Sequence, residues 1–231
     1  SRTLYYCIGF CESEKALAEG RFAMLKEAPR LFASERSERF GRLRTQCPDA
    51  RFNTVFNYWA EKQVSYCAIG KKAVRDNAQL AMGFLNFDTA RAKKVLAECL
   101  AHQYRDGHCV LLWYPVTDTK LYSDPSFWLS WAVCEYIKET GEFSFLDEEF
   151  PWLDGGAASV AEHIKAAARW YADAKNQGPH GLPKLHYADW NDALNIPDEN
   201  AESVFMAECV CLLMREIAEL FARAGDEAFS E

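Results

Sequence analysis

Apolar residues recur at three- and four-residue spacings along most of the chain, which is the pattern of helices that bury one face. In the segment 52–68, Phe52, Val55, Phe56 and Trp59 follow this spacing. The same pattern predicts helices over residues 13–45, 78–85, 89–104, 125–140, 156–174 and 202–224. Residues 1–10 instead alternate aromatic and β-branched positions, which is typical of a strand.

The segments between these helices carry residues that begin and end helices. Ser123-Asp124-Pro125 combines a capping side chain with a proline at the first helical position, and Gly141 is placed to end the same helix. Asp88 or Thr89 caps the helix over 89–104. There is no alternation of strands with helices and no glycine-rich phosphate loop. The pattern therefore predicts an all-α fold of stacked αα-hairpins.

Composition narrows the class of protein. The 231 residues are 49% apolar, and they include seven Trp, ten Tyr and fifteen Phe, so the chain is able to bury a large core. The net charge of −8 argues against a general binder of nucleic acid or anionic membranes. Aromatic faces suit sugar rings, although most of them fill cores.

The nine cysteines indicate the compartment and bear on metal binding. Their number is odd, most lie in apolar periodic segments, and the longest apolar run, 109–116, is too short to span a bilayer. A reduced, cytoplasmic protein is expected. The spacings Cys7-x3-Cys11, Cys99-x2-His102 and His108-Cys109 resemble ligand spacings, but no paired C-x-x-C framework accompanies them, so we expect no metal site.

The segment 178–204 is the first of two candidate binding loops. Asp189, Trp190, Asn191 and Asp192 place two carboxylates and an indole within four residues between two helices. Such a group suits a polar ligand with a flat face. The alternative is a capping turn, because Asp and Asn are ordinary turn residues.

The segment 70–80 is the second. Arg75 and Asp76 stand at the start of a helix, and Lys71 and Lys72 add a local positive patch that suits an anion. The alternative is an N-cap aspartate beside a surface arginine and two solvated lysines.

Other candidate residues are expected to be structural. The helical spacing of Trp128 and Trp131 assigns them to the core, Trp152 is interpreted as packing, and Trp113 is left as a candidate for a sugar cleft. Each histidine is expected to be structural or solvated, with the exception of His186, which lies near the 189–192 loop; the five are His102, His108, His163, His180 and His186.

Several motifs follow one another in an order typical of one enzyme family. They are Phe56-Asn57-Tyr58-Trp59, Arg75-Asp76-x-x-Gln79, Trp113-Tyr114-Pro115, Ser123-Asp124-Pro125-x-x-Trp128-Leu129, Ala188-Asp189-Trp190-Asn191-Asp192-Ala193-Leu194-Asn195 and Glu202-Ser203-Val204. Their order resembles the inverting oligosaccharide phosphorylases of glycoside hydrolase family ninety-four, which includes cellobiose and chitobiose phosphorylases.

The resemblance implies part of a six-hairpin α/α barrel. Residues 1–50 match the end of a β-sandwich domain and its linker helices, and residues 51–231 match the N-terminal part of the barrel. A complete barrel needs more helices than the pattern predicts here. We therefore expect an incomplete catalytic domain that is inactive by itself.

The resemblance also implies an activity: phosphorolysis of a β-linked gluco-oligosaccharide or disaccharide to a sugar 1-phosphate of inverted configuration. Asp192 matches the general acid. Trp190 and Asp76 match residues that hold the sugar on the non-reducing side of the scissile bond, and Arg75 shares or orients that contact. Phosphate is the co-substrate, with no other cofactor. A homodimer is left open, and no nucleic-acid or membrane partner is expected.

A single carboxylic acid in this loop is enough for the reaction that the resemblance implies. Inverting hydrolysis needs a carboxylic acid and a carboxylate base, whereas a phosphorylase needs only the acid because phosphate is already an anionic nucleophile. Asp192 must then be protonated when the substrate arrives, which burial or the nearby charge of Asp189 would favour.

The phosphate site departs from the family pattern. The family's arginine before Arg-Asp is missing, so Lys71 or Lys72 would bind phosphate, as a point charge rather than a fork. The family's other phosphate ligands, a His and a Thr-Gly pair, are not matched in this chain. Two alternatives stay open: an inverting hydrolase on the same barrel, and an inactive carbohydrate-binding fragment.

Overall fold

The computed structural model describes Glu27, Arg30 and residues 44–70, 72–194, 196 and 198–230. The predicted strand over 1–10 and nearly all of the predicted helix over 13–45 lie outside the described residues. The chain divides into two compact units, Ser1–Gln63 and Val64–Glu231. The domain boundary between residues 50 and 51 stays a prediction.

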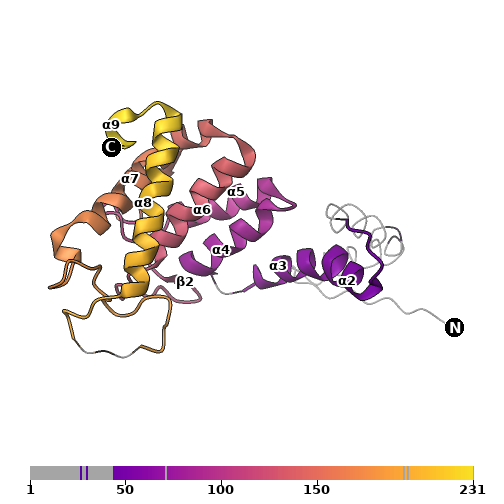
Figure 1. The fold of residues 1–231 in the computed structure, drawn as a ribbon, viewed down its shortest axis with the longest axis horizontal. Coiled ribbons are helices and arrows are strands. Elements are labelled where there is room, and N and C mark those ends of the chain that lie inside the picture. Colours follow the sequence, from indigo (N-terminus) through magenta and orange to yellow (C-terminus); the bar gives the residue numbers. More distant parts are fainter. Residues whose placement is uncertain are drawn as a thin grey trace, which may run out of the picture. The chain divides into compact units, whose positions relative to one another are not determined.

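The described elements are almost all helices (Figure 1). In chain order they are α2 (Ala50–Thr54), the π-helical η1 (Val55–Ala60), α3 (Glu61–Cys67), β1 (Lys72–Ala73), α4 (Val74–Leu85), α5 (Thr89–Leu100), β2 (Leu112–Tyr114), α6 (Pro125–Thr140), the 3-10 helix η2 (Phe143–Asp147), β3 (Glu149–Pro151), β4 (Ala157–Ser159), α7 (Val160–Ala172), the 3-10 helix η3 (Ala174–Asn176), α8 (Val204–Ala224) and α9 (Glu227–Ser230). The all-α prediction is confirmed, as part of an α/α toroid.

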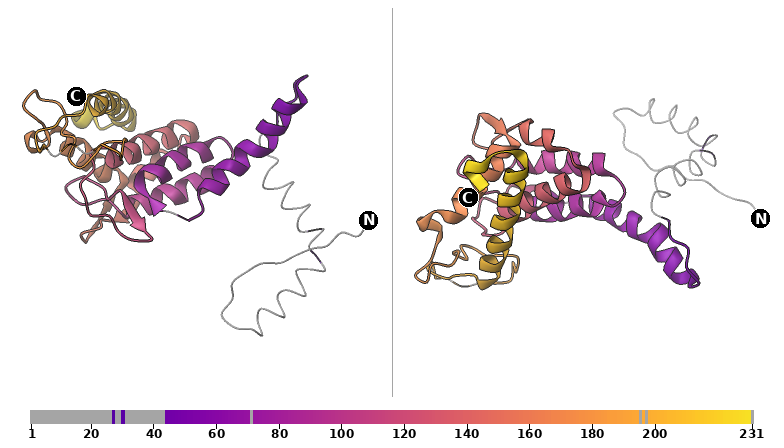
Figure 2. Two further views of the ribbon diagram at one scale, coloured as in Figure 1. Left: turned by 90° about the horizontal axis from the view of Figure 1, so that it is seen from below. Right: turned by 45° about the horizontal axis from the view of Figure 1, so that its top comes forward.

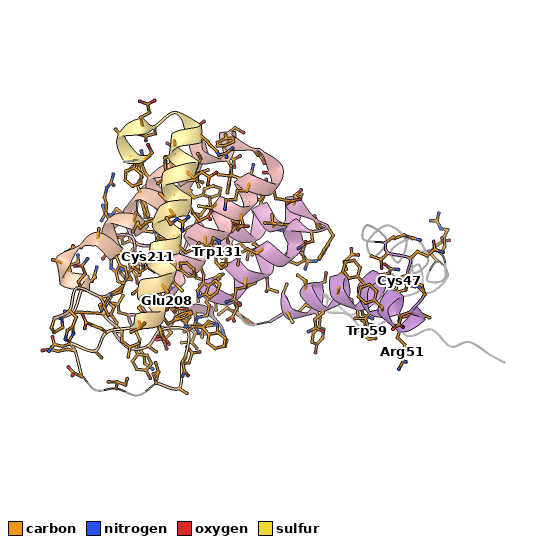
Figure 3. All side chains as sticks on the ribbon, in the orientation of Figure 1. Cys47, Arg51, Trp59, Trp131, Glu208 and Cys211 are labelled. Atoms are coloured by element: carbon orange, nitrogen blue, oxygen red, sulfur yellow. The ribbon has the colours of Figure 1, made fainter. Side chains whose placement is uncertain are left out.

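The helix predicted over 52–68 is present as the continuous run α2, η1 and α3. Asp49 begins it by accepting hydrogen bonds from the backbone N–H groups of Arg51 and Phe52. The side chain of Trp59 is half exposed (Figure 3).

The second unit is built around α4, which packs against both α5 and α6 (Figure 2). α8 also packs against α6. The largest fully buried side chains come from all of these helices and from η2 and α7: Phe84, Leu96, Leu100, Phe127, Leu129, Ile137, Phe145, Ile164, Leu213 and Phe221. Each such side chain stabilises the fold by about 1.5–3 kcal/mol relative to exposure.

α4 begins four residues before the predicted start at Ala78. The Val74 N–H donates to the carbonyl of Leu111 at 2.8 Å, and β1 pairs with β2, so a contact distant in sequence fixes this helix end. Arg75 and Asp76 therefore belong to the first turn of α4.

Both ends of α6 agree with the prediction. Pro125 is its first residue, and Gly141 ends it in the left-handed conformation at φ +69°. Asp124 stands at the N-cap position, but its side chain makes no capping hydrogen bond. The capping role predicted for Asp124 is therefore wrong, and its carboxylate has a different partner.

The loop of residues 177–203, orange at the lower end of α8 in Figure 1, is held by short pairings with other segments. Lys184 bridges to Glu202, and His186 bridges to Tyr122 just before α6. The Glu202 carboxylate accepts from the backbone N–H groups of His180 and Leu182 at 2.9 and 3.1 Å. These bonds tie residues 180–182 to Glu202, and residues 189–192 lie in the loop between them.

None of the described helices combines the length and the apolar content needed to cross a membrane.

Candidate active site

Arg75 is the centre of the candidate site, although one interpretation of the sequence placed it on the surface beside an N-cap aspartate. Only 6% of the residue is exposed. Its Nε donates to Asp124 Oδ2 at 2.6 Å and its Nη2 to Asp124 Oδ1 at 2.9 Å. Its Nη1 donates to Asp192 Oδ1 at 2.8 Å. The guanidinium thus joins two carboxylates that come from different parts of the chain.

The same guanidinium binds the backbone of the loop. Nη2 donates to the carbonyl of Asp189 at 2.9 Å, and Nη1 donates to the carbonyl of Trp190 at 3.2 Å. Burial by itself would lower the pKa of Arg75, but the hydrogen bonds and charges of Asp124 and Asp192 outweigh it and raise the pKa. Arg75 is therefore a permanent cation here.

Asp124 is completely buried. Besides the two Arg75 bonds, its Oδ2 accepts from the indole Nε1–H of Trp128 at 2.9 Å. Burial raises the pKa of Asp124 above its ordinary value, while the Arg75 and Trp128 donors oppose that rise. Trp128 is partly buried, and it donates a hydrogen bond to the site as well as packing in the core, as the sequence pattern predicted.

Asp189 is a structural residue of the loop. Its Oδ1 accepts from the Asn191 N–H at 2.9 Å, and its Oδ2 accepts from the Ser203 hydroxyl at 2.7 Å. Ser203 in turn caps α8 by accepting from the Met206 N–H. The loop is therefore attached to the N-terminal end of α8 through Asp189, and to α4 through Arg75.

Asp192 is the carboxylate that the loop presents outward, with 53% of its side chain exposed. Its Oδ1 accepts from Arg75, and its Oδ2 has no hydrogen-bond partner among the described residues. The expected burial is not found, because the Asp192 carboxylate is open to solvent and lies beside the Arg75 cation. Both oxygens of Asp189 accept hydrogen bonds, from the Asn191 N–H and from the Ser203 hydroxyl.

The structure brings only some of the predicted site residues together. Trp190 is 54% exposed beside Asp192 and presents its indole outward. Asp76 is exposed and lines a separate hollow of about 430 Å³ with Cys67, Gln79 and Leu80. Arg75 and Asp76 are adjacent in α4, but their surroundings differ: Arg75 holds the loop, and Asp76 lines this hollow.

The proposed phosphate ligands are not gathered at Arg75. Lys72 Nζ forms an ion pair with Glu98 on α5 at 3.0 Å. Lys71 lies outside the described residues. Phosphate binding by either lysine stays a prediction, and for Lys72 it would compete with the ion pair to Glu98.

The histidines take up packing or loop contacts. His163 is fully buried, stacks on Trp152 with ring centroids 3.6 Å apart, and its Nδ1 lies 2.8 Å from Gln103 Oε1. Burial lowers the pKa of His163 to about 4. His102 stacks on Trp113. The packing interpretation of Trp152 agrees with this contact.

His186 differs from the other histidines. It has a positive φ of 54°, its Nε2 is buried without a hydrogen-bond partner among the described residues, and burial lowers its pKa to about 4. It lines a hollow of about 540 Å³ beside the site loop with Lys120, Lys184 and Tyr187, among others.

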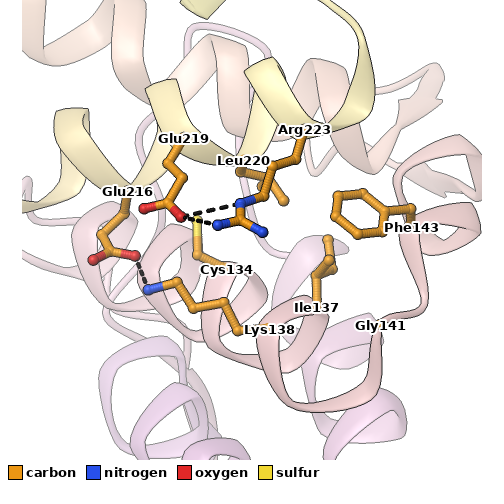
Figure 4. A pocket seen from close by; sticks show the side chains of 9 residues that line it. All are labelled: Cys134, Ile137, Lys138, Gly141, Phe143, Glu216, Glu219, Leu220 and Arg223. Atoms are coloured by element: carbon orange, nitrogen blue, oxygen red, sulfur yellow. Dashed lines mark hydrogen bonds and ion pairs between the residues drawn. The ribbon is translucent and has the colours of Figure 1, made fainter.

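A further hollow, of about 260 Å³, lies away from these residues, at the C-terminal halves of α6 and α8 (Figure 4). Lys138 pairs there with Glu216, and Arg223 with Glu219. Asp124 and Ser203 begin these two helices, so this hollow lies toward the opposite ends of α6 and α8.

Of the cysteines with ligand-like spacings, Cys7 and Cys11 lie outside the described residues, whereas Cys99 and Cys109 are described. Both thiols are buried, and burial raises the pKa of Cys109 to about 12, so a metal-binding thiolate is disfavoured there. Within the described ranges, no group of three or more His, Cys, Asp and Glu side chains is placed to hold a metal ion.

Sequence reasoning missed three residues that build the site. The sequence indicated a helix cap at Asp124 and an ordinary helix start at Ser203. Glu202 was part of a family motif, but no role was predicted for it. Gly178 lies so close to Glu202 that a Cβ on residue 178 would meet the Glu202 Cγ at 2.3 Å. This close approach was not evident from spacing along the chain.

Comparisons with known proteins point to one family. The family model of the glycosyl hydrolase 94 superfamily catalytic domain matches residues 36–231. A solabiose phosphorylase of Paenibacillus borealis is 36% identical over 214 residues, covering 90% of this chain and 27% of that protein. An N,N'-diacetylchitobiose phosphorylase of Vibrio proteolyticus is 28% identical over 200 residues, covering 69% of this chain and 25% of that protein.

A synthase also matches. A cyclic beta-(1,2)-glucan synthase of Rhizobium meliloti is 28% identical over 191 residues, covering 70% of this chain and 7% of that protein. The chain thus spans about a quarter of the length of the two phosphorylases, and less of the synthase.

Proposed function

We propose that this chain, which belongs to the glycosyl hydrolase 94 superfamily, contributes the general acid of an inverting glycoside phosphorylase. The reaction is phosphorolysis of a β-linked gluco-oligosaccharide or disaccharide. The products are a sugar 1-phosphate of inverted configuration and the shortened sugar. The activities of the solabiose and diacetylchitobiose phosphorylases support the phosphorylase class. The substrate is the one that the family resemblance implies.

The observation that carries the proposal is the outward presentation of Asp192. Of the carboxylates at this loop, Asp124 is buried on Arg75, and Asp189 is used by Asn191 and Ser203. Asp192 alone among these three has an oxygen that is open to a ligand. A group that protonates a leaving oxygen must reach the substrate, and this carboxylate meets that requirement.

Trp190 would provide the flat face for the sugar ring. Its indole is half exposed, while Arg75 holds its backbone carbonyl, so the ring stands on a fixed peptide next to Asp192. Asp76 lines a separate hollow, so its binding of sugar hydroxyl groups stays a prediction from the family resemblance.

The acid needs a change of surroundings during the reaction. In this structure Asp192 lies beside Arg75, and about half of its side chain is exposed. A sugar bound over Trp190 would remove water from Asp192, which favours the neutral, proton-donating form. Phosphate, being anionic already, would attack from the opposite face of the ring without a second carboxylate.

The test uses the complete gene product, incubated with a panel of β-linked disaccharides with and without phosphate. Release of sugar 1-phosphate is measured. We expect activity only with phosphate, and at least roughly a hundredfold loss in Asp192→Asn, the lower end of what general acid catalysis supplies. Asp173→Asn, an exposed carboxylate at the end of α7 that pairs with Lys175, is the control and should retain wild-type activity.

An Asp192→Asn variant with wild-type activity would refute the site assignment. Equal cleavage without phosphate would instead favour hydrolysis on the same scaffold.

A further inference from the structure

Asp124 is buried at the start of α6, where an aspartate would ordinarily cap the helix. Its carboxylate turns instead to Arg75 and Trp128. Both oxygens accept from Arg75, in the two-pronged geometry that fixes the plane of a guanidinium. A fully buried carboxylate costs stability unless such donors surround it. An aspartate that only capped the helix would not need the Arg75 and Trp128 donors.

Arg75 has five N–H donors, and the structure uses all five. Nε and one hydrogen of Nη2 go to Asp124, the other Nη2 hydrogen goes to the Asp189 carbonyl, and the two Nη1 hydrogens go to the Trp190 carbonyl and to Asp192. The guanidinium is a rigid fork. Once Asp124 fixes one edge of it, the direction of the Nη1 hydrogens is fixed as well.

The two arms of this fork differ in strength. The Arg75–Asp124 arm is buried, with side-chain exposures of 7% and 0%, whereas Asp192 on the other arm is 53% exposed. An ion pair with an exposed partner is weak and does not hold a loop by itself. The buried arm is therefore the anchor, and the loop is held against it.

We propose that Asp124 is a positioning residue that acts through Arg75: its buried carboxylate aims the guanidinium that holds the Asp189–Asp192 segment, and thereby sets the position of the Asp192 carboxylate. The proposal rests on the proposed function, in which Asp192 protonates the leaving group. Asp124 itself is shielded from substrate, because no part of it is exposed.

The test is a double-mutant cycle in the complete gene product, scored as kcat for release of sugar 1-phosphate. Asp124→Asn keeps the shape of the side chain and removes its charge, and an amide nitrogen would then face one Arg75 donor. We expect kcat to fall at least tenfold with the KM for phosphate changed less than threefold. In the Asp192→Asn background, followed over long incubations, Asp124→Asn should change kcat less than twofold.

The matched control is Asp226→Asn. Asp226 also accepts from a cation at 2.6 Å, Lys165, but this pair joins α7 to the segment before α9. Its kcat should stay within twofold of wild type. A merely structural role for Asp124 would instead lower kcat by the same factor in the wild-type and Asp192→Asn backgrounds, and that result would overturn the proposal. So would unchanged kcat in Asp124→Asn.

Trp128→Phe covers the case in which Asp124→Asn does not fold. It removes only the indole donor to Asp124 Oδ2. We expect a two- to fivefold fall in kcat that disappears in the Asp192→Asn background, and an unchanged kcat would count against the proposal. Failure of the proposed function is distinguishable, because it would appear as wild-type activity of the Asp192→Asn single variant.

Discussion

Replacing Arg75 with methionine tests the energetic part of the account, because it keeps the apolar length of the side chain and removes the guanidinium. Asp124 would stay buried with one remaining side-chain donor, the Trp128 indole, and the carbonyls of Asp189 and Trp190 would lose a partner. Breaking a buried ion pair from one side costs about 3–5 kcal/mol. The half-exposed arm to Asp192 adds at most about 1 kcal/mol.

The assay is urea and thermal unfolding of the chain, followed by circular dichroism. For a domain of this size the loss corresponds to a fall in Tm of roughly 6–20 °C. The control is Arg105→Met, which breaks an exposed pair with Asp154 and should cost less than about 1 kcal/mol. Equal, small losses in both variants would refute the buried-anchor argument. In Arg75→Met/Asp124→Leu, much of the stability should return, because no uncompensated charge is left.

Three further outcomes follow from the fold. His163 is buried with its pKa lowered to about 4, so as the pH falls the unfolded state takes up the proton before the folded state does. The free energy of unfolding should therefore fall by about 3 kcal/mol as the pH drops from about 6.5 to 4, measured as the difference in unfolding free energy between wild type and His163→Gln. Gly107→Ala should lower the unfolding free energy by more than about 3 kcal/mol, because φ is +104° and the new Cβ would meet the Ala166 carbonyl oxygen at 2.1 Å; Gly141→Ala, in open space, should cost about 1–2 kcal/mol. Iodoacetamide should label exposed Cys67 before buried Cys109 in native protein, and equal rates would contradict the burial.

Local sequence was sufficient for the helix ends that local chemistry decides. Pro125 and Gly141 bound α6 as predicted, and Asp88 accepts from the Arg91 N–H to begin α5. The predicted start of α7 at Gly156 was wrong because Ala157–Ser159 pairs with β3 instead, and Ser159 caps the helix. That pairing depends on where the chain returns, which the periodicity of one segment does not specify.

The residue types of the candidate site were also predictable, but not their connections. Arg75 and Asp192 were singled out separately, and they lie 117 residues apart in the sequence. Asp124 has the same sequence signature whether it caps α6 or holds an arginine. Only the packing of α4 against α6 decides between the two, because it brings the Arg75 fork to the start of α6.

The configuration of the product tests the proposed inverting phosphorolysis. The complete gene product is incubated with a β-linked disaccharide in phosphate buffer and followed by proton NMR, which distinguishes the anomers of a sugar 1-phosphate. Inverting phosphorolysis gives the α-anomer as the first product, formed only when phosphate is present and lost in Asp192→Asn. Free reducing sugar formed at the same rate without phosphate, or a first product of β configuration, would contradict it.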